Sequence, residues 1–160
     1  TTVNQVQNAA SQAVYAANSD ITGQYQYVAT LDARTSSICQ RLDGQLFRYD
    51  QGPVPPQHFN CRSTTVPVID DDDLARAFPN TRPSATGRVP QDTNYATWLK
   101  DNPDLQEKVL GKKKRYFNYL MSPKRGTKQL NPTNALKKII REDGTELTLK
   151  ELAAKYKDAN

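Results

Sequence analysis

Residues 30–44 read TLDARTSSICQRLDG, and the fold can be predicted outward from this stretch. Residues 25–31 (YQYVATL) alternate and are rich in β-forming side chains, which predicts a strand. Residues 35–41 are expected to form a short helix that begins at a capping Thr or Ser. Asp43-Gly44 favours a tight turn, and strand character returns at Leu46 and Phe47. The centre of the fold is therefore predicted to be strand, short helix, turn and strand.

Further elements are predicted on both sides of this centre. Val3, Val6, Ala10 and Ala13 recur at helical spacing, which predicts an amphipathic helix over about the first 17 residues. Residues 50–60 are rich in Gly, Pro and polar side chains and predict a long loop, and residues 63–69 predict a further strand. An acidic run opens a short helix predicted over residues 70–78, since acidic side chains favour helix first turns.

The rest of the chain predicts helices. A helix over residues 93–110 is interrupted at Pro103, and helices are also expected over residues 112–121, 133–141 and 148–156. Thr148 and Glu151 have the spacing of a capping box. The predicted class is α+β, with an N-terminal helix, a small β-sheet with long loops, and a C-terminal group of helices. We predict a core over residues 1–78, an extended linker or arm over 79–92, and a basic helical part of the same domain over 93–160.

Composition limits the kind of protein. The chain has 160 residues and a hydrophobic fraction of 36%, with a mean hydropathy of -0.79, so one small domain with a modest core is expected. No apolar run reaches the roughly 20 residues that span a bilayer, and no membrane contact is predicted. The sequence lacks an initiator Met and opens in the middle of a helical pattern. We therefore expect that a preceding segment is missing.

Positive charge is concentrated in one region. The whole chain has 22 Lys and Arg against 17 Asp and Glu, whereas residues 103–141 hold eleven basic residues against Asp104 and Glu107. Cations neutralise phosphates without reading sequence, so this region is a candidate DNA-binding surface. The candidate residues are Lys112, Lys113, Lys114, Arg115, Lys124, Arg125 and Lys128. On the alternative reading the interleaved Tyr116, Phe117 and Leu120 belong to the core and the lysines form a solvated helix face.

Both cysteines and the single histidine of the chain occur as Cys39-x18-His58-x2-Cys61. Thiolates and imidazole are the usual ligands of structural zinc, and Asp32 or Asp43 would supply a fourth ligand. A second reading has two packed, reduced thiols and a His58 that holds the loop by hydrogen bonding. A disulfide between the cysteines and a Cys/His nucleophile are the remaining readings.

Charged and turn-forming residues flank the same loops. We predict ion pairs that fix the loops against each other, formed by Asp32, Asp43 and Arg62. Arg62 is expected to make a bidentate contact with one of the two aspartates. The alternative is an active site built on the two aspartates. The residues predicted to have a structural role in these loops are Asp32, Arg34, Thr35, Asp43, Gly44, Asn60 and Arg62.

Residues 30–44, followed by PPQHFNCRST at 55–64, resemble the signature of the phage Mu F family of head morphogenesis proteins. The tail is similar to the closing segment of that family, with Trp98, Val109-Leu110-Gly111, and Asp143-Gly144 running to Leu152. Many members of the family have Cys-x-x-Cys where this chain has Ser36 and keeps Cys39. A site with four cysteine ligands is therefore excluded.

The resemblance implies a structural minor capsid protein of a tailed phage, assembled in the host bacterial cytoplasm and located in the head interior near the portal. It would aid procapsid assembly and DNA packaging or ejection. The implied partners are the portal protein, major capsid or scaffold proteins, and packaged double-stranded DNA contacted nonspecifically. No enzymatic activity is implied.

An effector reading is the alternative, because similar domains occur fused to toxins. Residues 62–65 (RSTT) are faintly similar to elements of ADP-ribosyltransferases, and such a toxin domain would be delivered with the phage genome. These enzymes usually also need a Glu-x-Glu pair, which the sequence lacks. The sequence also has no P-loop, and its single histidine makes a Ser-His-Asp set hard to build.

Overall fold

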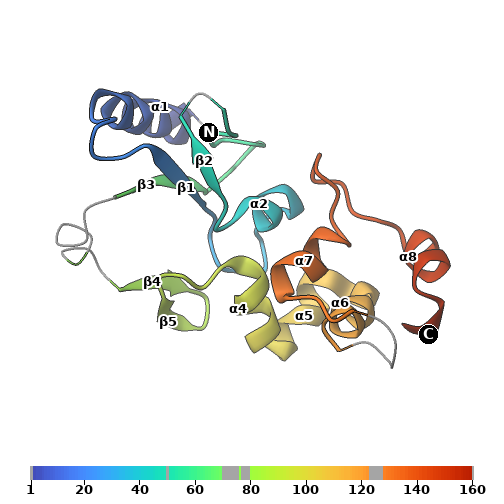
Figure 1. Cartoon of the computed structure of the whole chain (residues 1–160). Helices are drawn as coiled ribbons and strands as arrows, with labels where there is room; N and C mark the ends of the chain where they lie inside the picture. Colours follow the sequence, from blue (N-terminus) through green and yellow to red (C-terminus); the bar gives the residue numbers. More distant parts are fainter. Residues whose placement is uncertain (1, 50, 70–75, 77–79, 123–127, 160) are drawn as a thin grey trace. The chain divides into compact units, whose positions relative to one another are not determined.

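The computed structural model describes residues 2–49, 51–69, 76, 80–122 and 128–159. The chain divides into two compact units (Figure 1). Unit 1 comprises Thr1–Thr35 and Leu42–Thr93, and unit 2 comprises Ser36–Arg41 and Asn94–Asn160. The class is α+β, as predicted. The helix expected over residues 70–78 lies outside the described residues, apart from position 76.

Unit 1 is built on a three-stranded antiparallel sheet in the order β2-β1-β3 (Figure 1). The strands are β1 (Gln24–Val28), β2 (Leu46–Arg48) and β3 (Thr64–Val68). The alternation that predicted β1 places the fully buried Tyr25 and Tyr27 on one face. Tyr25 lies opposite Phe47 of β2 and Pro67 of β3, and Pro67 is tolerated because β3 is an edge strand.

The N-terminal helix α1 (Thr2–Ala17) packs on β3 through polar side chains. Asn4 donates from its amide to the Ser63 carbonyl at 2.9 Å, and Gln12 donates to the Thr65 hydroxyl at 3.2 Å. The Tyr15 hydroxyl donates to the Thr65 carbonyl at 3.0 Å. The predicted helix is confirmed, and hydrogen bonds from its polar face attach it to the sheet.

A second, two-stranded sheet occupies the segment predicted to be an extended linker or arm. It consists of β4 (Thr81–Ser84) and β5 (Gly87–Pro90), which form an antiparallel hairpin. Gly87 has a φ of +113°, which favours glycine, and it follows directly on the turn. In a two-stranded sheet each strand has one open side, so Pro83 and Pro90 do not prevent pairing. The proline content that suggested a linker is therefore compatible with a hairpin.

Unit 2 is helical. Its helices are α2 (Ser37–Leu42, apart from its last residue), α4 (Tyr95–Asp101), α5 (Pro103–Leu110), α6 (Lys114–Met121), α7 (Pro132–Lys137) and α8 (Leu149–Lys155), with short 3-10 turns η1 (Gly111–Lys113) and η2 (Lys157–Ala159). Pro103 begins α5, as predicted. The predicted capping box is present, because Thr148 and Glu151 each accept a hydrogen bond from the other's backbone amide.

The core of unit 2 is formed by side chains from its helices and from one non-helical segment. Trp98, Leu99 and Phe117 are buried, together with Ile140 and Leu152. The helix predicted over residues 133–141 is shorter, because α7 ends at Lys137 and Ile140 forms an isolated antiparallel bridge with Glu146. Ile140 is thereby part of the core without being helical.

Candidate functional site

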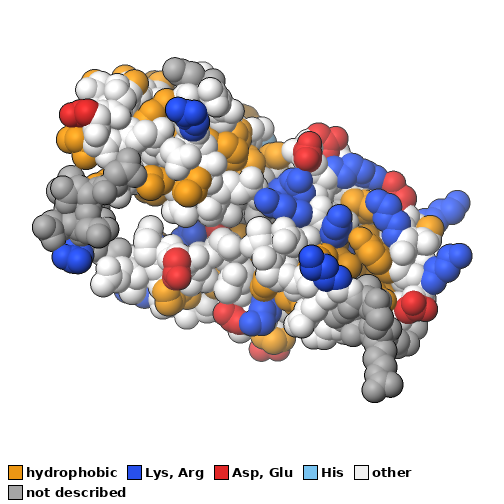
Figure 2. Space-filling model, in the orientation of Figure 1, with side chains coloured by type: hydrophobic (Ala, Val, Ile, Leu, Met, Phe, Trp, Pro, Cys, Tyr) orange, Lys and Arg blue, Asp and Glu red, His pale blue; other side chains and the backbone are white. Residues whose placement is uncertain are grey.

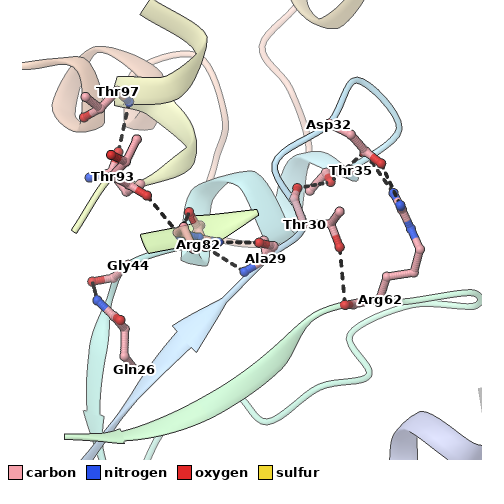
Figure 3. A network of polar contacts seen from close by, with 12 residues as sticks. Gln26, Ala29, Thr30, Asp32, Thr35, Gly44, Arg62, Arg82, Thr93 and Thr97 are labelled. Atoms are coloured by element: carbon pink, nitrogen blue, oxygen red, sulfur yellow. Dashed lines mark hydrogen bonds and ion pairs between the residues drawn. The ribbon is translucent and has the colours of Figure 1, made fainter. Parts of the chain in front are cut away.

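The loop after β1 is closed by an ion pair between Asp32 and Arg62. Arg62 donates from Nη1 and Nη2 to the two carboxylate oxygens of Asp32, at 2.6 and 2.9 Å (Figure 3). The Arg34 amide and the Thr35 hydroxyl also donate to this carboxylate, at 2.9 and 3.1 Å. The hydrogen bonds from Arg62 are the main reason why the pKa of Asp32 falls from 3.8 to about 2. Asp32 is therefore held as an anion in a fixed orientation.

Two threonines complete this loop. The Thr35 hydroxyl donates to the Thr30 carbonyl at 2.5 Å, and the Thr30 hydroxyl donates to the Arg62 carbonyl at 3.4 Å (Figure 3). The predicted residues Asp32, Arg34, Thr35 and Arg62 thus meet in one network of hydrogen bonds. Arg62 pairs with Asp32, which is one of the two aspartates predicted as its partner.

Asp43, the other aspartate, is engaged by an arginine that sequence reasoning missed. Arg82 of β4 donates from Nη1 and Nη2 to the two carboxylate oxygens of Asp43, at 3.1 Å each. The side chains are 7% and 0% exposed, respectively. The Ala29 amide donates to Asp43 at 2.6 Å, and Arg82 donates to the carbonyls of Ala29 and Thr93 at 2.5 and 3.0 Å (Figure 3). The buried charges are thereby paired and hydrogen-bonded, as burial requires.

Backbone conformation adds two further residues to these loops. Gly44 has a φ of +79° and donates from its amide to the Tyr27 carbonyl at 2.9 Å, so the Asp43-Gly44 turn returns the chain to β1. Asn60 has a φ of +58°, a left-handed conformation that Asn tolerates better than most residues. Both lie in the turns where the sequence placed them.

An open cavity of about 410 Å³ lies in unit 1, beside the Asp32–Arg62 pair and Arg82. Its walls are residues 28–32, Arg62, Thr64 and residues 82–85. Both arginines in the wall already face a carboxylate, so their charge is compensated within the protein. This arrangement fixes the loops and presents a wall of mixed apolar and paired polar groups.

The predicted metal ligands fall in both units, since Cys39 belongs to unit 2 and His58 and Cys61 belong to unit 1. Both cysteines are buried, and among the described residues they are not joined by a disulfide. His58 Nδ1 lies 2.8 Å from the Phe59 carbonyl. The donor types fit zinc. Asp32, the predicted fourth ligand, has both oxygens engaged by Arg62.

The basic stretch divides into residues with partners and residues at the surface. Lys113 pairs with Glu146 at 2.5 Å, Lys114 pairs with Glu107, and Arg115 lies 4.7 Å from the centroid of the Tyr116 ring. Tyr116, Phe117 and Leu120 are buried, as expected if they belong to the core. Lys112 and Lys128 are exposed, whereas Lys124 and Arg125 lie outside the described residues.

The two units also differ in charge when each is taken as a whole. The sequence of unit 2 contains 16 Lys and Arg against eight Asp and Glu, whereas unit 1 contains six against nine. Figure 2 shows several Lys and Arg side chains over the helices of unit 2. The positive potential of this protein therefore belongs to unit 2.

Residues 1–66 match the family model described as Phage Mu protein F like protein. The matched part includes α1, β1, α2, β2 and the loop that carries Cys61 and Arg62, and it confirms the resemblance over these residues. No match was found among curated proteins or among solved structures. No helix among the described residues has the length and apolar character needed to cross a membrane.

Proposed function

We propose that this protein is a non-enzymatic, structural component of a tailed-phage head that takes part in head morphogenesis. The observation that carries the proposal is the family match over residues 1–66, which includes Asp32, Asp43 and Arg62. In unit 1 these residues hold loops together through bidentate ion pairs. Residues within the part that matches the family model thus have a structural role, because they stabilise the loops.

The state of Asp32 argues against the alternative of an active site on two aspartates. A general acid at neutral pH needs a raised pKa. Arg62 instead lowers the pKa of Asp32 to about 2, and Asp43 is shielded from solvent by Arg82. Neither carboxylate is available to exchange a proton with a substrate without breaking an ion pair.

We also propose a location and partners for the protein. The protein lies inside the head near the portal, contacts the portal and the capsid or scaffold proteins, and helps DNA packaging or ejection. Its contact with double-stranded DNA is nonspecific and uses unit 2, since the excess of cations in that unit suits sequence-independent phosphate binding. Zinc is the metal expected for Cys39, His58 and Cys61, because thiolates and imidazole are its usual ligands in structural sites.

Omission of the gene tests this function directly. Host cells would produce the head proteins of the phage that encodes this chain, with and without its gene, and DNA-filled heads would be counted by electron microscopy. We expect fewer filled heads without the gene and recovery when the gene is supplied in trans. An effector delivered with the genome predicts normal head yields and an altered infected cell, and that result would replace the proposal.

A further inference from the structure

The helix α1 packs on the sheet of unit 1 through its polar face, and its apolar face is turned away from the sheet. Its face toward the sheet is formed by Asn4, Asn8, Gln12 and Tyr15, three of which hydrogen-bond to Ser63 or Thr65. Asn8 is 1% exposed, although it is an amide side chain. An amphipathic helix usually buries its apolar stripe against its own domain. Here the polar stripe occupies that position.

The apolar side chains of α1 consequently lie at the surface. Val3, Val6 and Val14 are 74%, 62% and 59% exposed. Hydrophobic side chains are visible over α1 in Figure 2. Valine is a weaker helix former than alanine or glutamine. Helix propensity therefore does not explain why valine stands at these three exposed positions.

The spacing of the exposed stripe follows a heptad. Val3, Val6, Ala10, Ala13 and Ala17 are separated by three, four, three and four residues, which are the a and d positions of a coiled coil. The flanking e and g positions are also exposed, and they are Thr2, Gln7, Ala9, Val14 and Ala16. The side chains that meet β3 occupy the b, c and f positions. The whole coiled-coil seam of α1 therefore points away from the sheet of its own unit.

We propose that the seam of α1, defined by Val3, Val6, Ala10, Ala13 and Ala17, pairs with the same seam of a second copy of this chain. α1 contains no Asp, Glu, Lys or Arg. In coiled coils, charged residues at the e and g positions favour particular partners, and α1 has none. Two identical seams can therefore meet without like-charge repulsion. The small alanines allow the two helices to approach closely. A membrane surface suits this helix less well, because interfacial helices carry Lys or Arg on their polar face.

The size of the seam limits its strength. The 16 residues of α1 make a helix about 24 Å long. Stable interfaces bury about 800 Å² on each partner, and one short helix supplies less than that. The dimer is therefore weak and dependent on concentration, and it would be favoured where several copies gather at one site.

Sedimentation of the full chain over a concentration series tests the pairing. The wild-type protein is expected to pass from monomer to dimer. Ala10→Glu places a charge at the centre of the seam and should weaken dimerisation by at least about tenfold, because two carboxylates would face each other in an apolar contact. Gln5→Glu is the matched control, since Gln5 is exposed on the same helix at a c position outside the seam. Circular dichroism would verify that both variants keep α1.

Cross-linking supplies a more sensitive test, because a disulfide traps dimers that form only transiently. Ala10 lies near the middle of α1, so a cysteine there meets its counterpart in either parallel or antiparallel pairing. Ala10→Cys should form a disulfide-linked dimer under mild oxidation and Gln5→Cys should not, while the native Cys39 and Cys61 are buried. A wild-type chain that stays monomeric at every concentration would overturn the proposal. Equal cross-linking of the two cysteine variants would do the same.

Discussion

Arg82 and Asp43 are 39 residues apart in the sequence and form a buried bidentate ion pair in the interior of unit 1. This contact fastens the β4–β5 hairpin to the turn between α2 and β2. The backbone of Ala29 takes part on both sides, since its amide donates to Asp43 and its carbonyl accepts from Arg82. The pair therefore joins three segments at one point.

Removal of one partner should be costly. Asp43→Ala leaves the Arg82 guanidinium buried with an unbalanced charge, and breaking a buried pair in this way typically costs about 3–5 kcal/mol. We expect a loss of that size in the free energy of unfolding, measured by urea denaturation. Asp101→Ala is the control, because its contact with Lys100 is 3.7 Å long and exposed, and it should cost less than about 1 kcal/mol. Equal effects of the two variants would contradict this role.

Acid should weaken the Asp32–Arg62 pair. The pKa of Asp32 is about 2 in the folded state and 3.8 ordinarily, so its stabilisation is present above about pH 4 and is lost as the pH falls through about 2. The amount is about 1 kcal/mol, since Arg62 is 40% exposed and the pair is screened by solvent. Arg62→Gln should return the pKa of Asp32 toward 3.8 in a carboxyl NMR titration. A wild-type Asp32 that titrates near 3.8 would disprove the pairing.

Gly144 should resist substitution. It has a φ of +82°, and a Cβ there would lie 2.5 Å from the Cβ of Ile38. The left-handed conformation alone costs about 1–2 kcal/mol with a side chain, and the contact with Ile38 adds to it. Gly144→Ala should therefore lower the free energy of unfolding by about 2 kcal/mol or more. Gly23→Ala, where a Cβ meets nothing within 4 Å, should be close to neutral.

Binding to double-stranded DNA should depend on salt and on exposed cations of unit 2. Each phosphate contact contributes about 0.9 to the slope of log affinity against log salt. Lys112→Gln and Lys128→Gln should each reduce that slope by up to this amount, as measured by fluorescence anisotropy. Arg88→Gln in unit 1 should leave it unchanged, and Lys113→Gln should have a smaller effect because Lys113 pairs with Glu146. Binding that is insensitive to salt would refute this mode.

Metal content distinguishes the readings of Cys39, His58 and Cys61. Protein purified without chelator should contain about one equivalent of zinc by mass spectrometry, and a chelator should lower its thermal stability. His58→Ala should reduce zinc retention, and His58→Cys, which keeps a zinc-binding donor, should retain more. Two titratable thiols under denaturing conditions and no metal would favour packed, reduced cysteines.

Local signals predicted much of this fold. The helical period of α1, the alternation of β1, the Pro103 start and the Thr148 cap depend on neighbours within a few residues, so each could be read from the sequence. The partner of Asp43 could not, because Arg82 is distant and lies in a segment without periodicity. Likewise, the helical period of α1 places its apolar residues on one face of the helix. It does not show whether that face or the polar face packs on the sheet. Tertiary contacts with Ser63 and Thr65 decide that.

As a proposed structural component of the phage head, this protein should be present in every assembled head. Quantitative mass spectrometry of purified, nuclease-treated particles of the encoding phage would test it, with the chain counted against the portal protein. We predict a constant low number of copies in each head, retained after the tails are removed. Particles that contain none of this chain, although the infected cells produce it, would contradict the account.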